Sequence, residues 1–321
     1  MITKSKGLNI LGQLLLLSAA VVWGSSFIIL KETIETVPAL YVIGVRFLAS
    51  ALLIGAVFFR KIKTISKKTL LHGTILGVVI ASAYITQTLG LKYISAGKNA
   101  FITSLYCVMC PFLLWIAFGV RPKSYHIISA VLCVTGVGLI AVSSAESDGG
   151  NAFLGCALTF FCAIFYCLQI IFTGKFHQQK SDAIQLLVIQ LLTVGIIISA
   201  CSLAFELPFC GIAAYKLNTD QILRILYLTL VCTLYAQLAQ IIGLKFTEAN
   251  QAAIILTLEA VFGVVFAVIL GDEQITPVLL SGFAVIFIGT VISELRIDVL
   301  RIFYKKTRAA FCDTNEKDET D

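Results

Sequence analysis

Long apolar segments separated by short polar connections make up most of the chain. If helical, ten of these segments are long enough to cross the hydrocarbon core of a bilayer, so we expect ten membrane-spanning helices. Their approximate bounds are 8–30, 39–59, 70–89, 96–118, 125–143, 153–173, 183–205, 222–243, 250–270 and 277–292. The first follows Lys4 and Lys6. It is longer than the core of a cleaved signal peptide, which predicts a retained helix.

The composition supports this interpretation. Of 321 residues, 59% are hydrophobic and 13% are charged, and the mean hydropathy is +0.96. A soluble domain has about 25% charged residues. The predicted fold class is therefore all-α, a polytopic membrane protein of ten transmembrane helices. Ten spans leave no room for a large soluble catalytic domain.

The basic residues predict the orientation of the helices. If the N-terminus is cytoplasmic, eighteen of the 24 Lys and Arg residues fall on the cytoplasmic side and five on the other side, and Arg46 lies inside a span. Cytoplasmic connections of membrane proteins carry the excess of Lys and Arg. Both termini are therefore expected in the cytoplasm. The net charge of +6 is explained in this way and indicates no nucleic-acid partner.

The two halves of the chain resemble each other. An offset of 153 residues aligns Gly90-Leu91-Lys92-Tyr93 with Gly243-Leu244-Lys245-Phe246, and without a gap it also aligns Gly136 with Gly289. An offset of 143 aligns Leu11-Gly12 with Leu154-Gly155. The predicted domains are a five-helix repeat over 1–145, a second over 150–295, and a tail over 296–321 that is first basic and then acidic. Five is an odd number, so the second repeat is inverted.

Inverted repeats are typical of carriers, because one unit in two orientations can open a central site to either side of the membrane. A duplicated channel, a duplicated membrane enzyme or a simple stable bundle would show the same repeat. The basic tail segment 296–311 is interleaved with apolar residues, which predicts a helix on the anionic lipid surface. The acidic end of the tail is expected to be disordered.

Two ionisable residues fall inside predicted spans, where a charge is costly unless it has a function or a partner. Glu259 is a candidate for proton coupling or cation recognition, and the alternative is a carboxylate that bonds neighbouring helices. Arg46 is a candidate for binding a substrate carboxylate or phosphate with two parallel hydrogen bonds. Alternatively, the Arg46 side chain extends to the lipid headgroups or forms an ion pair with an acidic residue that has only a structural role.

Further polar and aromatic residues at membrane depth are candidates for lining a cavity. Thr233, Gln237 and Gln240 lie on one helix face. The repeat aligns Gln87 with Gln240 and Tyr106 with Glu259, which adds Gln87 and Tyr106 to the candidates. The alternative is hydrogen bonding that only joins helices. Trp23 is a candidate for stacking on substrate, with packing through its small neighbours as the alternative. Lys98 is expected at the membrane interface, with a substrate contact as the alternative.

Other chemistry is not indicated. Most of the ten cysteines lie in apolar segments, and the spacing of Cys107 and Cys110 lacks a second such pair or a nearby histidine. The sequence contains no phosphate-binding loop of the GxxxxGK[ST] type and no HExxH motif. We therefore expect no catalytic residues, no cofactor, no metal and no enzymatic activity.

Several short motifs resemble those of a known family. They are Trp23-Gly24-Ser25-Ser26-Phe27, the segment from Gly90 to Lys98 with the later Pro111, and Leu258-Glu259-Ala260 followed by Gly271-Asp272-Glu273. Together with the repeat they resemble the EamA family of the drug/metabolite transporter (DMT) superfamily. Ala260 stands where many members have proline after the glutamate, so the helix shape there is expected to differ.

The resemblance implies a secondary transporter in the bacterial inner membrane, with a cavity between the halves. Its partners would be a small-molecule substrate, membrane lipids and, as an open alternative, a coupling proton or cation. An amino-acid-like metabolite is favoured, because Arg46 and Glu259 would recognise opposite charges. The alternatives are an exporter of drugs or cationic compounds, and an integral membrane enzyme or lipid-modifying scaffold. The sequence leaves substrate, direction, coupling ion and oligomeric state open.

Overall fold

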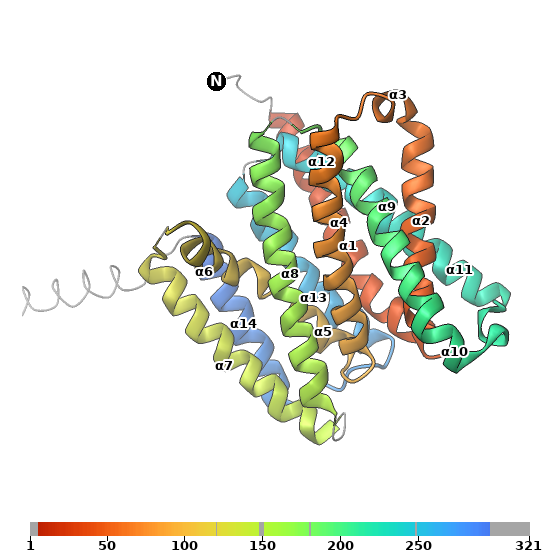
Figure 1. Cartoon of the computed structure of the whole chain (residues 1–321). Helices are drawn as coiled ribbons and strands as arrows, with labels where there is room; N and C mark the ends of the chain where they lie inside the picture. Colours follow the sequence, from red (N-terminus) through yellow and green to blue (C-terminus); the bar gives the residue numbers. More distant parts are fainter. Residues whose placement is uncertain (1–5, 120, 148–150, 180, 248, 296–321) are drawn as a thin grey trace, which may run out of the picture.

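The computed structural model describes residues 6–119, 121–147, 151–179, 181–247 and 249–295. These residues form helices and connecting segments only, which confirms the predicted all-α class (Figure 1). Within this part of the chain, eight helices are long and apolar enough to cross a membrane. The apolar segments Ser124–Ile140 and Ile254–Ile269, each part of a longer helix, lie at the two remaining predicted spans. The predicted tail helix over 296–311 and the acidic end lie outside the described residues.

The helix bounds agree with the hydropathy prediction to within a few residues. The first half contains α1 (Lys6–Ile34), α2 (Ala39–Val57), the short α3 (Phe59–Ile62), α4 (Lys67–Leu91), α5 (Ala96–Thr103), α6 (Tyr106–Phe118) and α7 (Ser124–Ser147). The second half contains α8 (Ala152–Gln178), α9 (Ala183–Cys201), the π-helix η1 (Ser202–Glu206), α10 (Leu207–Cys210), the 3₁₀ helix η2 (Ile212–Tyr215), α11 (Thr219–Tyr227), the π-helix η3 (Leu228–Tyr235), α12 (Ala236–Phe246), α13 (Ala249–Ile269) and α14 (Pro277–Leu295).

Several helices begin where a polar side chain satisfies the free backbone N–H groups of the first turn. Ser66 accepts a hydrogen bond from the Thr69 amide at the start of α4, and Ser95 accepts one from the Lys98 amide at the start of α5. Asp182 does the same for two amides of α9. These caps explain why the apolar segments become helical at those positions.

The packing of the two halves follows the repeat. Equivalent helices pack on each other, α2 on α9 and α7 on α14. The first helix of each half packs on later helices of the other half, α1 on α12 and α13, and α8 on α4, α5 and α6. In Figure 1, α1 begins at the end of the bundle where α3 lies, whereas α8 begins at the opposite end. The halves therefore have opposite directions, as the odd helix number predicts.

Two glycine contacts repeat this symmetry at close range. A Cβ atom added to Gly12 would lie 3.1 Å from the carbonyl oxygen of Gly243, and one added to Gly155 would lie 3.1 Å from that of Gly90. The offsets of 143 and 153 residues relate one contact to the other. Without side chains between them, α1 and α12, and likewise α8 and α4, approach closely.

The structure differs from the sequence prediction in local helix geometry. The predicted helix over 96–118 is divided into α5 and α6 at Ser104 and Leu105, where the Leu105 amide bonds to the Ile102 carbonyl at 3.2 Å, one residue short of an α-helical bond. The predicted helix over 222–243 contains the π-helix η3. Hydropathy does not detect either change, because the segments stay apolar throughout. By contrast, α13 continues through Ala260, which lacks the ring of proline.

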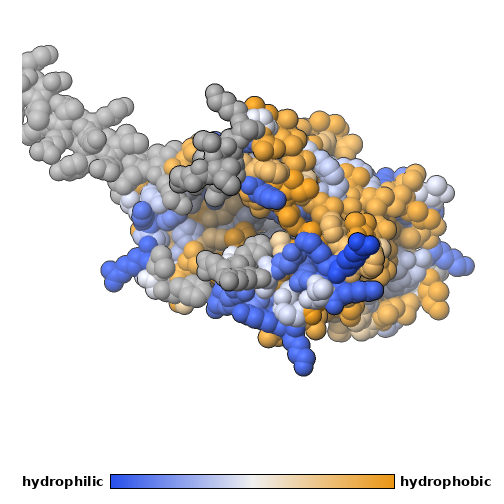
Figure 2. Space-filling view, turned by 90° about the horizontal axis from the view of Figure 1, so that it is seen from above, coloured by the Kyte–Doolittle hydropathy of each residue, from blue (hydrophilic) through white to orange (hydrophobic). Residues whose placement is uncertain are grey.

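The surface has the polarity expected of a membrane protein. Figure 2 looks onto the end of the bundle that carries α3 and shows hydrophilic residues gathered over this end, with hydrophobic residues prominent around the sides. Large apolar side chains such as Leu52, Ile116 and Phe153 are exposed along the helices. A helix surface of this kind needs hydrocarbon around it.

Candidate functional site

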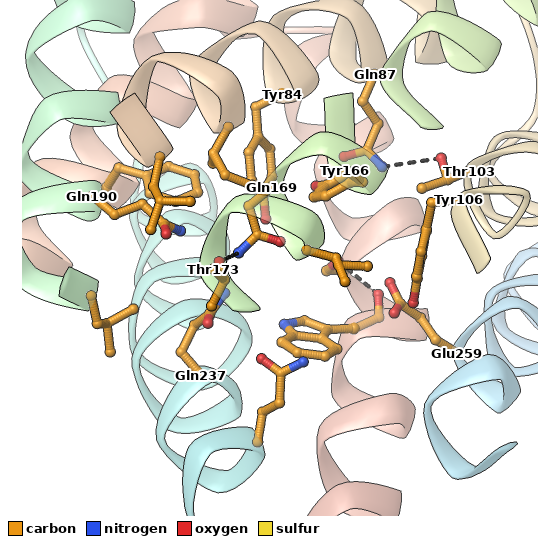
Figure 3. Close-up of a pocket in the computed structure, with 18 of the residues that line it drawn as sticks. Tyr84, Gln87, Thr103, Tyr106, Tyr166, Gln169, Thr173, Gln190, Gln237 and Glu259 are labelled. Atoms are coloured by element: carbon orange, nitrogen blue, oxygen red, sulfur yellow. Dashed lines mark hydrogen bonds between the residues drawn. The ribbon is translucent and has the colours of Figure 1, made fainter. Parts of the chain in front are cut away.

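A cavity of about 310 Å³ lies between the two halves of the molecule (Figure 3). Its volume is in the range of sites that hold small molecules. The polar residues that line it are Ser26, Arg46, Gln87, Thr103, Gln169, Thr173, Gln190, Gln237, Gln240 and Glu259, and its aromatic residues are Trp23, Phe27, Phe47, Tyr84, Tyr106 and Tyr166. Both halves therefore contribute to one cavity at membrane depth.

The two ends of the cavity differ in exposure. Toward the end of the bundle that carries α3, the lining includes Ala183 at the start of α9 and Leu244 near the end of α12, both at least partly exposed. Toward the opposite end the lining includes Leu30 and Leu91, which are buried. The cavity thus opens toward the α3 end and is closed at the other.

Arg46 on α2 is 2% exposed, so its side chain does not reach the membrane surface. Its Nε donates a short hydrogen bond to the hydroxyl of Thr233. Its guanidinium also lies 5.6 Å and 5.7 Å from the ring centres of Phe47 and Tyr84. Among the described residues, its two terminal amino groups have no hydrogen-bond or ion-pair partner. These groups are the part of the side chain that can bind an anionic oxygen pair.

Thr233 accepts a hydrogen bond from Arg46 but is not part of the cavity lining. It lies in the π-helix η3, and its hydroxyl donates to the Leu228 carbonyl oxygen five residues earlier at 2.9 Å. That hydroxyl therefore has its lone pairs directed toward Arg46. Short π-helical segments occur frequently at functional sites. The prediction that Thr233 lines the cavity is wrong, because its hydroxyl contacts Arg46 and the residue is not part of the lining.

Glu259 on α13 is the acidic residue of the cavity lining. Within the described part of the chain its carboxylate has no ion pair and no hydrogen-bond donor. In Figure 3 it lies next to the phenol of Tyr106 and away from Gln190. The alternative of a carboxylate that bonds neighbouring helices therefore has no contact to support it. A carboxylate in this position needs a proton, a cation or a cationic substrate group to compensate its burial.

Amide and aromatic side chains form the rest of the wall. Gln87 donates to Thr103 at 3.2 Å, and Gln169 donates to Thr173 at 3.2 Å (Figure 3). Trp23 contributes its indole to the lining and donates its N–H to the Cys232 carbonyl oxygen at 3.0 Å. Its neighbour Gly24 packs closely on Phe262 and Gly263. The motif thus combines a cavity residue with a packing residue.

The structure brings most of the predicted site residues together. Trp23, Arg46, Gln87, Tyr106, Gln237, Gln240 and Glu259 all line the cavity, and Thr233 lies behind Arg46. Which of them contact a substrate stays a prediction. Lys98 differs from expectation, because it is 1% exposed and forms an ion pair with Glu273 in place of facing the membrane interface.

Sequence reasoning missed the contribution of α8, which supplies Tyr166, Gln169 and Thr173 to the cavity. A signal for two of these residues was present. The offset of 143 residues that aligns Gly12 with Gly155 also aligns Trp23 with Tyr166 and Ser26 with Gln169. Applying the repeat to Trp23 would have found this wall of the cavity.

The cysteines in the described part of the chain form no recognisable metal site. Cys110 lies 3.0 Å, sulfur to sulfur, from Cys167, which is too few ligands for a tetrahedral site. Among the described residues, no group of three or more His, Cys, Asp and Glu side chains converges in a way that could hold a metal ion.

Comparisons with known proteins agree with one another. One protein of Archaeoglobus fulgidus, described as an uncharacterized transporter, is 28% identical over 281 residues, which cover 87% of this chain and 84% of that protein. The uncharacterized transporter YvbV of Bacillus subtilis is 24% identical over 278 residues, covering 85% and 88%. Neither description names a substrate.

A solved structure, described only as the crystal structure of a protein, superposes with a TM-score of 0.64 at 14% identity and covers 90% of this chain and 98% of that one. At this identity the likeness concerns the fold alone. The model of the EamA-like transporter family matches residues 10–142 and again 153–295. These two matches include nearly all of both halves, and the chain therefore belongs to the EamA-like transporter family.

Proposed function

We propose that this transporter is a secondary carrier for a small organic metabolite with an amino-acid-like distribution of charge. It exposes the cavity alternately to the two sides of the membrane. The two family matches and the opposed directions of the halves support the alternating-access part. The basic residues support an orientation with both termini in the cytoplasm of a bacterial cell, and then the cavity of this structure opens inward.

The observation that carries the proposal is the state of the two cavity charges. Arg46 and Glu259 line one cavity, yet no ion pair joins them. Both side chains line the cavity, where a bound molecule would compensate the cost of placing their charges at membrane depth. A molecule with a carboxylate at one end and an ammonium at the other would satisfy both residues at once.

The geometry around Arg46 supports recognition of a carboxylate. Thr233 uses the Nε hydrogen, and the Phe47 and Tyr84 rings restrict the guanidinium plane, so the terminal amino groups remain for the ligand. A planar pair of donors matches the planar pair of carboxylate oxygens. The small cavity volume limits the molecule to metabolite size.

A second candidate function is export of a cationic compound. Glu259 lines the same cavity as Trp23, Tyr106 and Tyr166, and a cation over aromatic faces near a carboxylate is well stabilised. In that case Arg46 would not contact the substrate. The two candidates therefore make different predictions for Arg46.

The deciding experiment is counterflow with the full-length protein in liposomes. Four classes are loaded in turn: neutral amino acids, sugar phosphates, nucleosides and cationic dyes. We expect counterflow of amino acids. Arg46→Gln removes charge-assisted hydrogen bonds of about 1.5–3 kcal/mol each, which should weaken the apparent affinity on the order of 10- to 100-fold. Arg60→Gln, at an exposed site outside the cavity, is the control and should not change it.

Two further results of the same experiment decide between the alternatives. If counterflow occurs only with cationic dyes and Arg46→Gln leaves it unchanged, the zwitterion proposal is wrong and the cation exporter is correct. Glu259→Gln should lose the response to an imposed pH gradient if the carboxylate carries a proton, and an unchanged response removes that role. Absence of counterflow in all four classes, with folded protein, contradicts both candidates.

A further inference from the structure

A second set of charges lies at the closed end of the cavity, two of them buried and two partly exposed. It comprises Lys31, Lys98, Asp272 and Glu273, which we call the ion-pair latch. We propose that the latch holds this end of the transporter shut while the cavity is open at the α3 end, and that it separates in each transport cycle. The proposal assumes alternating access, but its test requires no knowledge of the substrate.

Asp272 makes the outer contacts of the latch. It lies in the connection between α13 and α14, directly after Gly271, whose positive φ of 83° gives the chain a sharp turn. One carboxylate oxygen accepts from the Ala96 amide at 2.6 Å, and the other lies 2.6 Å from the ammonium of Lys31. Asp272 thus joins the start of α5 and the last turn of α1 to the second half.

Glu273 makes the inner contacts. Its carboxylate lies 3.7 Å from the ammonium of Lys98 and also accepts a short hydrogen bond from the hydroxyl of Ser95. The side chains of Lys98 and Glu273 are 2% and 3% exposed, so this pair is removed from water. A Cβ atom on Gly97 would lie 2.8 Å from the carboxylate, and glycine at this position therefore makes room for it.

The latch is positioned to close the cavity. Lys31 directly follows Leu30, a buried residue of the cavity lining, and α5 ends at Thr103, which also lines the cavity. Every contact described above joins the first half to the connection between α13 and α14 in the second half. Opening this end of the cavity by moving the halves apart requires these contacts to break.

The repeat provides an internal comparison at the open end. The offset of 153 residues aligns Lys98 with Gln251, and Gln251 accepts a hydrogen bond from Gln13 at 3.0 Å on the exposed surface. The connection between α6 and α7, equivalent to that between α13 and α14, contains Arg121 and Lys123, which are exposed, and no acidic residue. The position equivalent to Lys98 thus makes a neutral contact between exposed amides, whereas Lys98 itself forms a buried ion pair.

The energetics of buried ion pairs suit a contact that must open repeatedly. The attraction between two buried charges is largely cancelled by the cost of removing them from water. When the halves separate, water enters and hydrates both partners together, so neither is left buried alone. The latch can therefore specify one closed arrangement without making it permanent.

The test is hydrogen–deuterium exchange of the full-length protein in lipid nanodiscs. In the double variant Lys98→Met, Glu273→Gln, the introduced side-chain amide still accepts from Ser95 and no buried charge is left alone. We expect residues 92–104 and 270–277 to exchange about tenfold faster, and residues 183–187 and 240–247 to exchange more slowly, because the population shifts toward the opposite opening.

Two more variants keep the result interpretable. Lys31→Met leaves the buried pair of Lys98 and Glu273 intact. It should change the exchange rates in the same direction as the double variant, by a smaller factor. Lys61→Met removes an exposed ion pair with Asp182 that joins the halves at the other end, and should leave exchange at the latch unchanged. Faster exchange at both ends in the double variant would mean general loss of stability. That result, or unchanged exchange in both latch variants, would overturn the proposal.

Discussion

The molecule holds two sets of opposite charges inside the helix bundle, and they are arranged in different ways. In the cavity, Arg46 and Glu259 face the same space without forming an ion pair. At the closed end, Lys98 and Glu273 pair with each other and are almost completely removed from water. Charges of the first kind lower stability and are available to a ligand, whereas charges of the second kind are already compensated and fix the arrangement of the halves.

The contacts distinguish two kinds of intramembrane charge that composition alone would treat as one. All four residues lie in or next to apolar helices, and an intramembrane charge indicates function by default. Only the contacts distinguish a residue that is available to a substrate from one that holds two parts of the protein together. The comparison therefore predicts opposite consequences for equivalent substitutions.

The largest expected effect concerns stability. Glu273→Gln leaves the Lys98 ammonium buried without its carboxylate, and loss of one partner of a buried pair costs about 3–5 kcal/mol. Glu259→Gln removes a carboxylate that has no partner to lose, so the free energy of unfolding should stay the same or rise. Unfolding of the two variants in detergent by SDS titration measures both changes. Equal destabilisation by both variants would mean that the two acids do not differ as described.

A medium effect is expected at the residue that orients Arg46. Thr233→Val keeps the shape of the side chain and removes the hydroxyl that accepts from Nε. Loss of the hydrogen bond from Nε, about 1 kcal/mol, should raise the half-saturation concentration for a carboxylate substrate roughly fivefold, with little change in maximal rate; the bond from the hydroxyl to the Leu228 carbonyl oxygen is lost as well. Liposome uptake with the best substrate of the counterflow experiment provides the measurement.

The control for this variant is Thr135→Val, whose hydroxyl lies on the exposed face of α7 and bonds only to its own helix. A similar rise in both variants would attribute the effect to helix geometry. A fall in maximal rate with unchanged half-saturation in Thr233→Val would also contradict a positioning role.

The smallest effect is expected at the exposed ion pair of Lys61 and Asp182, which are 3.0 Å apart. Burial raises the pKa of Asp182, but the Lys61 ammonium and the amides of Gln185 and Ile184 outweigh it, so the pKa is lowered. The stabilisation is therefore present above the ordinary pKa of 3.8 and is lost as the pH falls through the lowered value. For an exposed pair it amounts to about 0–1 kcal/mol, reduced further by salt.

Asp182→Asn tests this sign. The difference in thermal midpoint between the variant and the unmodified protein should be small near neutral pH and should shrink below pH 3.8. A difference that grows at acid pH would contradict the lowered pKa.

Much of the fold could be predicted from the sequence, because the bilayer requires long apolar helices and these are visible in a single chain. The start of α2 follows from hydropathy alone, and that of α9 from hydropathy and the Asp182 cap. The division between α5 and α6 and the π-helix η3 could not be predicted. Both depend on backbone hydrogen bonds that shift by one residue within an apolar segment.

The site was predictable where a polar residue stands out at membrane depth, as Arg46 and Glu259 do. The latch was not, because Lys98 begins a helix and Glu273 lies in a connection, where charged residues are ordinary. Their pairing spans 175 positions of the chain, and a single sequence contains no information on which distant residues meet.

The repeat gives the cavity a property that identical halves would lack. Equivalent positions hold Arg46 and Gln190, Tyr106 and Glu259, and Trp23 and Tyr166, and all six residues line the cavity. Two identical halves would offer an asymmetric molecule two poses of equal energy, related by the pseudo-twofold axis. Divergence of these pairs removes that degeneracy. The cavity of the duplicated protein therefore has two chemically different ends, and a substrate with two unlike ends fits in one orientation only.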